Sequence, residues 1–116
     1  MARKELELCP GVLIGDGQPV FVIAEIGQNH QGDLATAKQM ITAAGQAGAH
    51  CVKFQKSSLE HKFTAAALAR PYTGPHSWGD TYGEHKEHLE FSEEQYKELQ
   101  QHAAQEVNKD FKEYER

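Results

Sequence analysis

The sequence predicts an α/β fold, and three consecutive features in the first half of the chain carry this prediction. The run Val20–Ala24 is apolar on both faces, which is typical of a parallel strand covered on both sides. Apolar residues then recur at helical spacing between residues 34 and 47. A second short apolar run at residues 49–55 predicts another strand. Strand, helix and strand in this order form a βαβ unit over residues 20–55, whose crossover should be right-handed.

Residues 1–19, which precede this unit, predict an N-terminal ribbon. Leu6 and Leu8 lie on one side of Cys9-Pro10-Gly11, and Val12–Ile14 lie on the other, which suits either a short hairpin or an irregular ribbon. Residues 15–19 contain two glycines and a proline and therefore predict a turn. The Gly15-Asp16-Gly17 spacing is not a dinucleotide fingerprint, which would follow a strand and open a helix.

The predicted helix has clear signals at both ends. Asp33 is a good N-cap because its carboxylate can accept hydrogen bonds from the first free backbone N–H groups. Gly45 and Gly48 allow close packing, and Gly48 can end the helix in the left-handed conformation. One apolar stripe runs along the helix and contains Leu34, Ala37, Met40, Ile41, Ala44 and Ala47.

Side-chain alternation along the two strands predicts a functional site. Glu25 lies at the carboxyl end of the first strand, on the side of Phe21 and Ile23, and Lys53 and Gln55 share one side of the second strand. An outer layer of helices would cover Val52 and Phe54 on the opposite side, which turns Lys53 and Gln55 toward the inside of a barrel. Barrel enzymes place their chemistry at the carboxyl ends of the strands. The alternative is an ordinary ion pair between Glu25 and Lys53.

Residues 56–91 predict a long irregular segment of the kind that closes active sites, with a helical turn or two at residues 64–69. Arg70-Pro71 should end that helical piece, because a residue before proline avoids helical geometry. Loops of this length in compact domains are usually functional or disordered. Aromatic side chains along the segment could close over a ligand: Tyr72, His76, Trp78, Tyr82, His85 and His88.

Residues 92–116 predict a helix with a divergent tail. Ser92 and Gln95 form a capping box, and Phe91 with Tyr96 forms a hydrophobic staple around it. Because neither glycine nor proline interrupts the pattern, we expect one helix from Ser92 to near Tyr114. Its apolar stripe contains Tyr96, Leu99, Ala103, Val107, Phe111 and Tyr114.

Composition narrows the possible partners. The 116 residues carry a formal net charge of -5, with 17 acidic and 12 basic residues, which argues against a nucleic-acid surface. No apolar run approaches the roughly 20 residues of a membrane span, and the first residues do not form a secretory signal. Cys9 and Cys51 fit no metal or redox spacing. We therefore expect a single-domain cytoplasmic protein with reduced thiols and no membrane or nucleic-acid partner.

Several separated stretches, taken in order, resemble the N-terminal part of the animal sialic acid synthase family. They are Leu6–Gly11, Ile23–Asp33, Lys53–Lys56, Arg70–Thr73, His76–Gly79, Thr81–Lys86 and His88–Ser92. The resemblance implies an aldolase-type (β/α)₈ barrel, of which residues 1–116 would be an N-terminal fragment. It also implies condensation of phosphoenolpyruvate with N-acetylmannosamine 6-phosphate to give N-acetylneuraminate 9-phosphate.

The resemblance assigns roles to the three residues singled out by alternation. Lys53 matches a lysine that binds phosphoenolpyruvate, and Glu25 and Gln55 match residues that face the amino-sugar. An ammonium group is a compact positive charge for a carboxylate or a phosphate. A carboxylate accepts hydrogen bonds from sugar hydroxyls and can transfer protons. The resemblance also implies a divalent metal, Mn or Mg, that polarises the sugar aldehyde, with its ligands outside this chain.

Residues 107–116 depart from the family, which continues with a glycine and an apolar third strand where this chain is charged and helix-like. Such a barrel needs about 250 residues. We therefore expect a truncated, alternatively spliced or mispredicted product that is catalytically inactive by itself. The alternative is a non-catalytic chain that binds a full-length synthase subunit, a ligand or a second copy of itself.

Three other features have plain interpretations beside functional ones. Asn29 and His30 either face the site or only shape the loop before the helix. His85 and His88 have the i, i+3 spacing of metal ligands, but without a third ligand we expect solvated loop residues. Cys51 is expected to be a small buried hydrophobe rather than a nucleophile.

Overall fold

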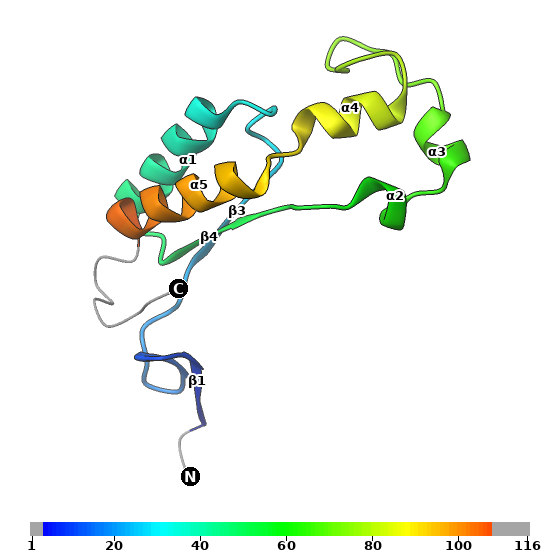
Figure 1. Cartoon of the computed structure of the whole chain (residues 1–116). Helices are drawn as coiled ribbons and strands as arrows, with labels where there is room; N and C mark the ends of the chain where they lie inside the picture. Colours follow the sequence, from blue (N-terminus) through cyan, green and yellow to red (C-terminus); the bar gives the residue numbers. More distant parts are fainter. Residues whose placement is uncertain (1–3, 108–116) are drawn as a thin grey trace.

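The computed structural model describes residues 4–107, which form two small sheets and a set of helices (Figure 1). The strands are β1 (Glu5–Cys9), β2 (Val12–Gly15), β3 (Ile23–Gly27) and β4 (Cys51–Phe54). The helices are α1 (Leu34–Gln46), α2 (Leu59–Lys62), α3 (Ala65–Ala69), α4 (Tyr82–Leu89) and α5 (Glu93–Glu106). The predicted α/β class is confirmed, and the described residues contain two two-stranded sheets and no closed barrel.

The N-terminal ribbon is a hairpin. β1 and β2 pair antiparallel from Glu5 opposite Gly15 to Cys9 opposite Val12, with an irregularity between Glu7 and Cys9. Figure 1 shows this hairpin extending away from the helices, joined to β3 by one connecting segment. The hairpin interpretation is therefore confirmed for Glu5–Gly15.

β3 and β4 are parallel neighbours and α1 connects them, which confirms the strand–helix–strand unit. The first strand begins three residues later than predicted: β3 spans Ile23–Gly27, whereas the apolar run predicts a strand at Val20–Ala24. Its predicted cover on both faces is also wrong, since Ile23 is 54% exposed and Val20 is 79% exposed. Helices cover one face of the sheet only, and no element of residues 4–107 covers the other.

α1 begins and ends as predicted. The Asp33 carboxylate accepts hydrogen bonds from the backbone N–H groups of Ala35 and Thr36. Gly48 follows the C-cap Ala47 with a φ of 94°, the left-handed conformation that glycine adopts without strain. Of the two glycines predicted to allow close packing, Gly45 does so, because a Cβ there would lie 1.9 Å from the Glu106 carbonyl oxygen. Gly48 does not, because a Cβ there would meet nothing within 4 Å.

α5 begins where its capping box predicts and ends earlier than expected. Both hydrogen bonds of the Ser92–Gln95 box are present, and the Phe91 and Tyr96 rings meet edge-on with centroids 5.7 Å apart. The helix ends at Glu106, and Val107 is extended with its side chain in the core. Burial of Val107 beside α1 thus outweighs continuation of the helix. The predicted remainder, with Phe111 and Tyr114, lies outside the described residues.

One hydrophobic core joins α1, α5 and the covered face of the β3–β4 sheet (Figure 1). Val52 and Phe54 pack against it, as the alternation along β4 predicts. Most of both predicted helical stripes also contribute, although Ala47 is exposed. The buried members are Ile26, Ala37, Ile41, Phe91, Leu99 and Val107.

The segment 56–91 is more helical than predicted. The expected turn at residues 64–69 is α3, which ends before Arg70-Pro71 as anticipated. The sequence does not predict α2 or α4. α2 has only four residues, and α4 has few apolar residues and buries only Leu89. Its start is nevertheless well capped, since Thr81 Oγ1 accepts a hydrogen bond from the Glu84 N–H group.

The molecule is elongated. Its radius of gyration is 17.7 Å, whereas a compact domain of similar length has a value of about 13 Å. Figure 1 shows the hairpin and the α2–α4 segment extending from opposite ends of the α1–α5 layer. Within residues 4–107, no helix combines the length and apolar character needed to cross a membrane.

Candidate functional site

Glu25 and Lys53 are direct cross-strand neighbours on the uncovered face of the sheet. The parallel register pairs the two residues, and Lys53 Nζ lies 3.4 Å from Glu25 Oε2. Their side chains are 55% and 64% exposed. An ion pair so exposed contributes about 0–1 kcal/mol to stability. The pair is therefore available to a ligand at little cost to the fold.

Gln55 extends the same polar surface beyond the end of β4. The Gln55 N–H group donates to the Gly27 carbonyl oxygen, which holds the two chain segments together after the strands. A Cβ on Gly27 would lie 3.6 Å from Gln55 Oε1 and 3.8 Å from Glu25 Oε1. Because Gly27 has a φ of 59° and no side chain, it leaves that space open. The structure thus brings all three predicted site residues to one face.

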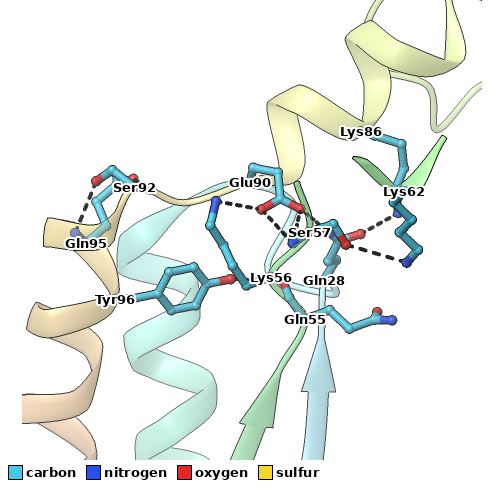
Figure 2. Close-up of polar contacts among 10 residues, drawn as sticks. All are labelled: Gln28, Gln55, Lys56, Ser57, Lys62, Lys86, Glu90, Ser92, Gln95 and Tyr96. Atoms are coloured by element: carbon cyan, nitrogen blue, oxygen red, sulfur yellow. Dashed lines mark hydrogen bonds and ion pairs between the residues drawn. The ribbon is translucent and has the colours of Figure 1, made fainter. Parts of the chain in front are cut away.

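A second polar cluster, which sequence reasoning missed, centres on Glu90. Its two carboxylate oxygens accept hydrogen bonds from Gln28 Nε2, Lys56 Nζ and the Ser57 N–H group at 3.1–3.3 Å. The Glu90 side chain is only 11% exposed. Figure 2 shows these side chains gathered beyond the carboxyl ends of β3 and β4. We call this set of residues, with Lys62 and Lys86, the Glu90 network.

The Glu90 network also holds Lys62 and Lys86. Lys86 Nζ donates to Gln28 Oε1 at 2.6 Å, and Lys62 Nζ lies 3.5 Å from Ser57 Oγ. Burial lowers the pKa of Lys86, and the positive charge of Lys62 lowers it further, while Glu90 opposes both effects. No sequence spacing reveals this network, because Gln28 and Glu90 are 62 residues apart. The only signal is that both residues belong to the family-like stretches.

The loop between β3 and α1 is shaped by Asn29 and His30. Asn29 Nδ2 donates to the Ile26 carbonyl oxygen, and the Gly32 N–H group donates to His30 Nδ1. The His30 ring is fully buried and lies near the rings of Phe54 and Phe91. In their contacts with the described residues, both side chains therefore stabilise the loop before α1, which is the plainer of the two predicted roles.

His85 and His88 lie on α4 rather than in a loop, which corrects the prediction. The Trp78 N–H group donates to His85 Nδ1, and the His88 ring stacks on the Trp78 ring with centroids 4.1 Å apart. Trp78 Nε1 in turn donates to Gln31 Oε1 beside α1. Within the described range, no three His, Cys, Asp or Glu side chains lie close enough to hold a metal ion. The implied Mn or Mg therefore does not fit the described residues.

The fold and the site together indicate a ligand-binding α/β protein. Charged and amide side chains lie at the carboxyl ends of two parallel strands, which is where α/β proteins bind their ligands. The model of the NeuB family matches residues 40–109. This chain belongs to the NeuB family.

Relatives and a solved structure agree with this assignment. The chain is 65% identical over 101 residues to the N-acetylneuraminate-9-phosphate synthases of Mus musculus and Homo sapiens, covering 87% of this chain and 28% of each relative. It is 63% identical over 92 residues to the Drosophila melanogaster enzyme of that name. It thus spans about a quarter of the length of these relatives.

The solved structure is that of an N-acetylneuraminic acid (sialic acid) synthetase from Leptospira borgpetersenii in complex with citrate. The two chains superpose with a TM-score of 0.62 at 30% identity, over 91% of this chain and 32% of that one. The elements described above therefore resemble part of a larger α/β enzyme.

Proposed function

We propose that this chain supplies one wall of the active site of a sialic acid synthase. The reaction is the condensation of phosphoenolpyruvate with N-acetylmannosamine 6-phosphate to N-acetylneuraminate 9-phosphate and phosphate. The observation that carries the proposal is the Glu25–Lys53 pair with Gln55 on the uncovered face of the sheet. In an aldolase-type barrel that face points inward, toward the ligand. The resemblance to named synthases supports the choice of reaction.

Each of the three residues has a role that suits its chemistry. The Lys53 ammonium group binds the carboxylate or phosphate of phosphoenolpyruvate, because its charge is paired only weakly with Glu25. The Glu25 carboxylate accepts hydrogen bonds from hydroxyl groups of the sugar, and the Gln55 amide accepts hydrogen bonds at its oxygen and donates them from its nitrogen. Glu25 is also placed to take part in proton transfer. Mn or Mg, which would polarise the aldehyde, would be held by residues beyond this segment.

We expect no turnover from the 116 residues alone. Residues 4–107 supply two parallel strands, whereas a (β/α)₈ barrel closes its site with eight strands in about 250 residues. Purified chain, mixed with both substrates and Mn²⁺, should therefore release no phosphate above the rate of a blank. Measurable turnover would contradict this expectation.

The role of Lys53 is tested in a chimera in which the matched 101 residues replace those of the mouse relative. The chimera should release phosphate only with both substrates present. Lys53→Gln should lower kcat/KM about 100-fold, as expected when a charged contact to the reacting substrate is lost. Lys97→Gln is the matched control, since Lys97 is an exposed lysine on α5 that pairs with Glu93. A folded but inactive chimera, or full activity in Lys53→Gln, would contradict the proposal.

A second candidate function is binding of a full-length synthase subunit. A groove of about 250 Å³ lies between β4 and α5, lined by Val52, Phe54, Tyr96, Leu99, Gln100 and Ala103. The outer edge of β4 has no neighbouring strand among residues 4–107, so it can accept a strand from another chain. Co-purification with the mouse enzyme at near-equal stoichiometry, weakened by Ala103→Lys, would support this function. A folded monomer that does not bind the enzyme would contradict it.

A further inference from the structure

The Glu90 network holds more positive than negative charge. The network contains three ammonium groups and one carboxylate: Lys56 contacts Glu90 directly, Lys86 contacts the Glu90 partner Gln28, and Lys62 lies near the Ser57 hydroxyl. Both Glu90 oxygens are already used by Lys56, Gln28 and the Ser57 N–H group. The network therefore has an excess of two positive charges, and neither Lys62 nor Lys86 has a carboxylate as a direct hydrogen-bond partner among the described residues.

Lys62 and Lys86 are held in place by neutral partners. Lys86 Nζ contacts the Gln28 amide oxygen, and Lys62 Nζ lies near the Ser57 hydroxyl. An ammonium group has three N–H donors, so each lysine retains donors for a ligand. Burial lowers the pKa of Lys86, and the positive charge of Lys62 lowers it further. An anion placed between these two lysines would relieve that repulsion.

We propose that Lys56, Lys62 and Lys86 form a binding subsite for a phosphate monoester. Such a phosphate carries about two negative charges at neutral pH, which matches the excess charge of the network. Lysine binds phosphate as a point charge, without a fixed geometry. The subsite is set by residues of the β4–α2 connection, α2 and α4, whereas Lys53 lies within β4. It adjoins the Glu25–Lys53–Gln55 face, because Gln55 directly precedes Lys56 in the β4–α2 connection.

The two substrates of the proposed reaction both carry a phosphate that could bind at this subsite. The choice between them rests on the proposed function. Both the amino-sugar 6-phosphate and phosphoenolpyruvate carry a phosphate monoester. Because Lys53 on the neighbouring face is assigned to phosphoenolpyruvate, the sugar phosphate is the expected ligand of the lysine subsite. The experiment includes both compounds.

The direct test is NMR of the lysine ε-CH₂ groups in the 116-residue chain. Titration with inorganic phosphate should shift the signals of Lys56, Lys62 and Lys86 saturably, while Lys97 serves as the internal control. N-acetylmannosamine 6-phosphate should compete with phosphate, whereas unphosphorylated N-acetylmannosamine should not. Stronger competition by phosphoenolpyruvate than by the sugar phosphate would assign the subsite to the other substrate and overturn the expected ligand.

Variants separate a binding role from a structural one. Lys62→Gln should weaken phosphate binding about tenfold, the effect of losing one charge-assisted contact. Lys86→Arg should retain binding because it keeps the charge, and Lys97→Gln should have no effect. In the chimera, Lys62→Gln should raise the KM for the sugar phosphate about tenfold with little change in kcat.

The outcomes distinguish this inference from the proposed function. Saturable phosphate binding by the chain, together with an inactive folded chimera, supports the subsite and contradicts the proposed reaction. An active chimera with unchanged KM in Lys62→Gln overturns the subsite alone. Shifts that do not saturate and that Lys97 shares equally also overturn it.

Discussion

His30 shows how one side chain sets the geometry next to the site. Its Nδ1 accepts a hydrogen bond from the Gly32 N–H group, so the proton of the neutral ring lies on Nε2. That Nε2 atom is buried and has no hydrogen-bond partner among the described residues. Burial lowers the pKa of His30, and the charge of Glu90 and the Gly27 backbone oppose this only partly. The folded loop therefore requires the neutral imidazole.

We predict that protonation of His30 destabilises the chain at low pH. Because the pKa of His30 is lower in the folded than in the unfolded state, the unfolded state binds more protons below a pH of about 6.5. The free energy of unfolding should therefore fall as the pH decreases from 7.5 to 5. Urea unfolding of the chain and of His30→Gln should show a flatter pH profile in the variant.

The control for this prediction is His61→Gln, since His61 is exposed on α2. This variant should retain the pH dependence of the original chain. An equal slope in His30→Gln and the original chain would show that other groups cause the pH dependence.

At the level of elements, the contact between α1 and α5 fixes the helix layer. Lys38 Nζ pairs with Glu98 at 2.5 Å, and His102 contacts Thr42 Oγ1 and the Lys38 carbonyl oxygen. At Gly45 the backbone of α1 lies directly against the end of α5, leaving no room for a Cβ beside the Glu106 carbonyl oxygen. The layer holds Val52 and Phe54 on its side of the sheet, which leaves Lys53 on the open side.

We predict that Gly45→Ala destabilises this layer. Helix propensity alone would favour alanine by about 1 kcal/mol. The new Cβ would however lie 1.9 Å from the Glu106 carbonyl oxygen, which is backbone and cannot rotate away. Overpacking of this kind costs about 1–3 kcal/mol. Urea unfolding should therefore show a lower midpoint, whereas Gly74→Ala, which meets nothing within 4 Å, should change it little. A higher midpoint in Gly45→Ala would contradict the close contact.

The starts of α1 and α5 could be predicted from the sequence, and the end of α5 could not. Asp33 and the Ser92–Gln95 box act on backbone groups two or three residues away, so their effect is local. The end of α5 depends on burial of Val107, which belongs to the core shared with α1. α4 was missed because its short, polar sequence has no apolar stripe to signal it.

At the scale of the whole molecule, much apolar surface is exposed. The hairpin and the segment leading to β3 expose Leu6, Leu8, Leu13, Val20, Val22 and Ile23. The sheet also has one uncovered face, and each of its strands has an edge that pairs with no other described strand. Contiguous apolar surface and open edges favour association with another chain.

We predict that the purified 116-residue chain self-associates with rising concentration. Sedimentation velocity should show a larger species that decreases in Val22→Ser/Ile23→Ser, because this variant removes apolar surface from the start of β3. Lys97→Ser, on the exposed face of α5, should leave the distribution unchanged. A monomer at every concentration would contradict the prediction.

The sequence by itself determined the strand–helix–strand unit, its caps and the shared face of Glu25, Lys53 and Gln55. These follow from local hydrogen bonding and from side-chain alternation, which act over a few residues. Only the tertiary structure decided that one face of the sheet is bare, that α5 ends at Glu106, and that Gln28 and Lys56 bind Glu90 while Lys86 binds Gln28. The contacts around Glu90 join residues that are 34 to 62 positions apart in the sequence, and a local sequence pattern cannot predict contacts over such separations.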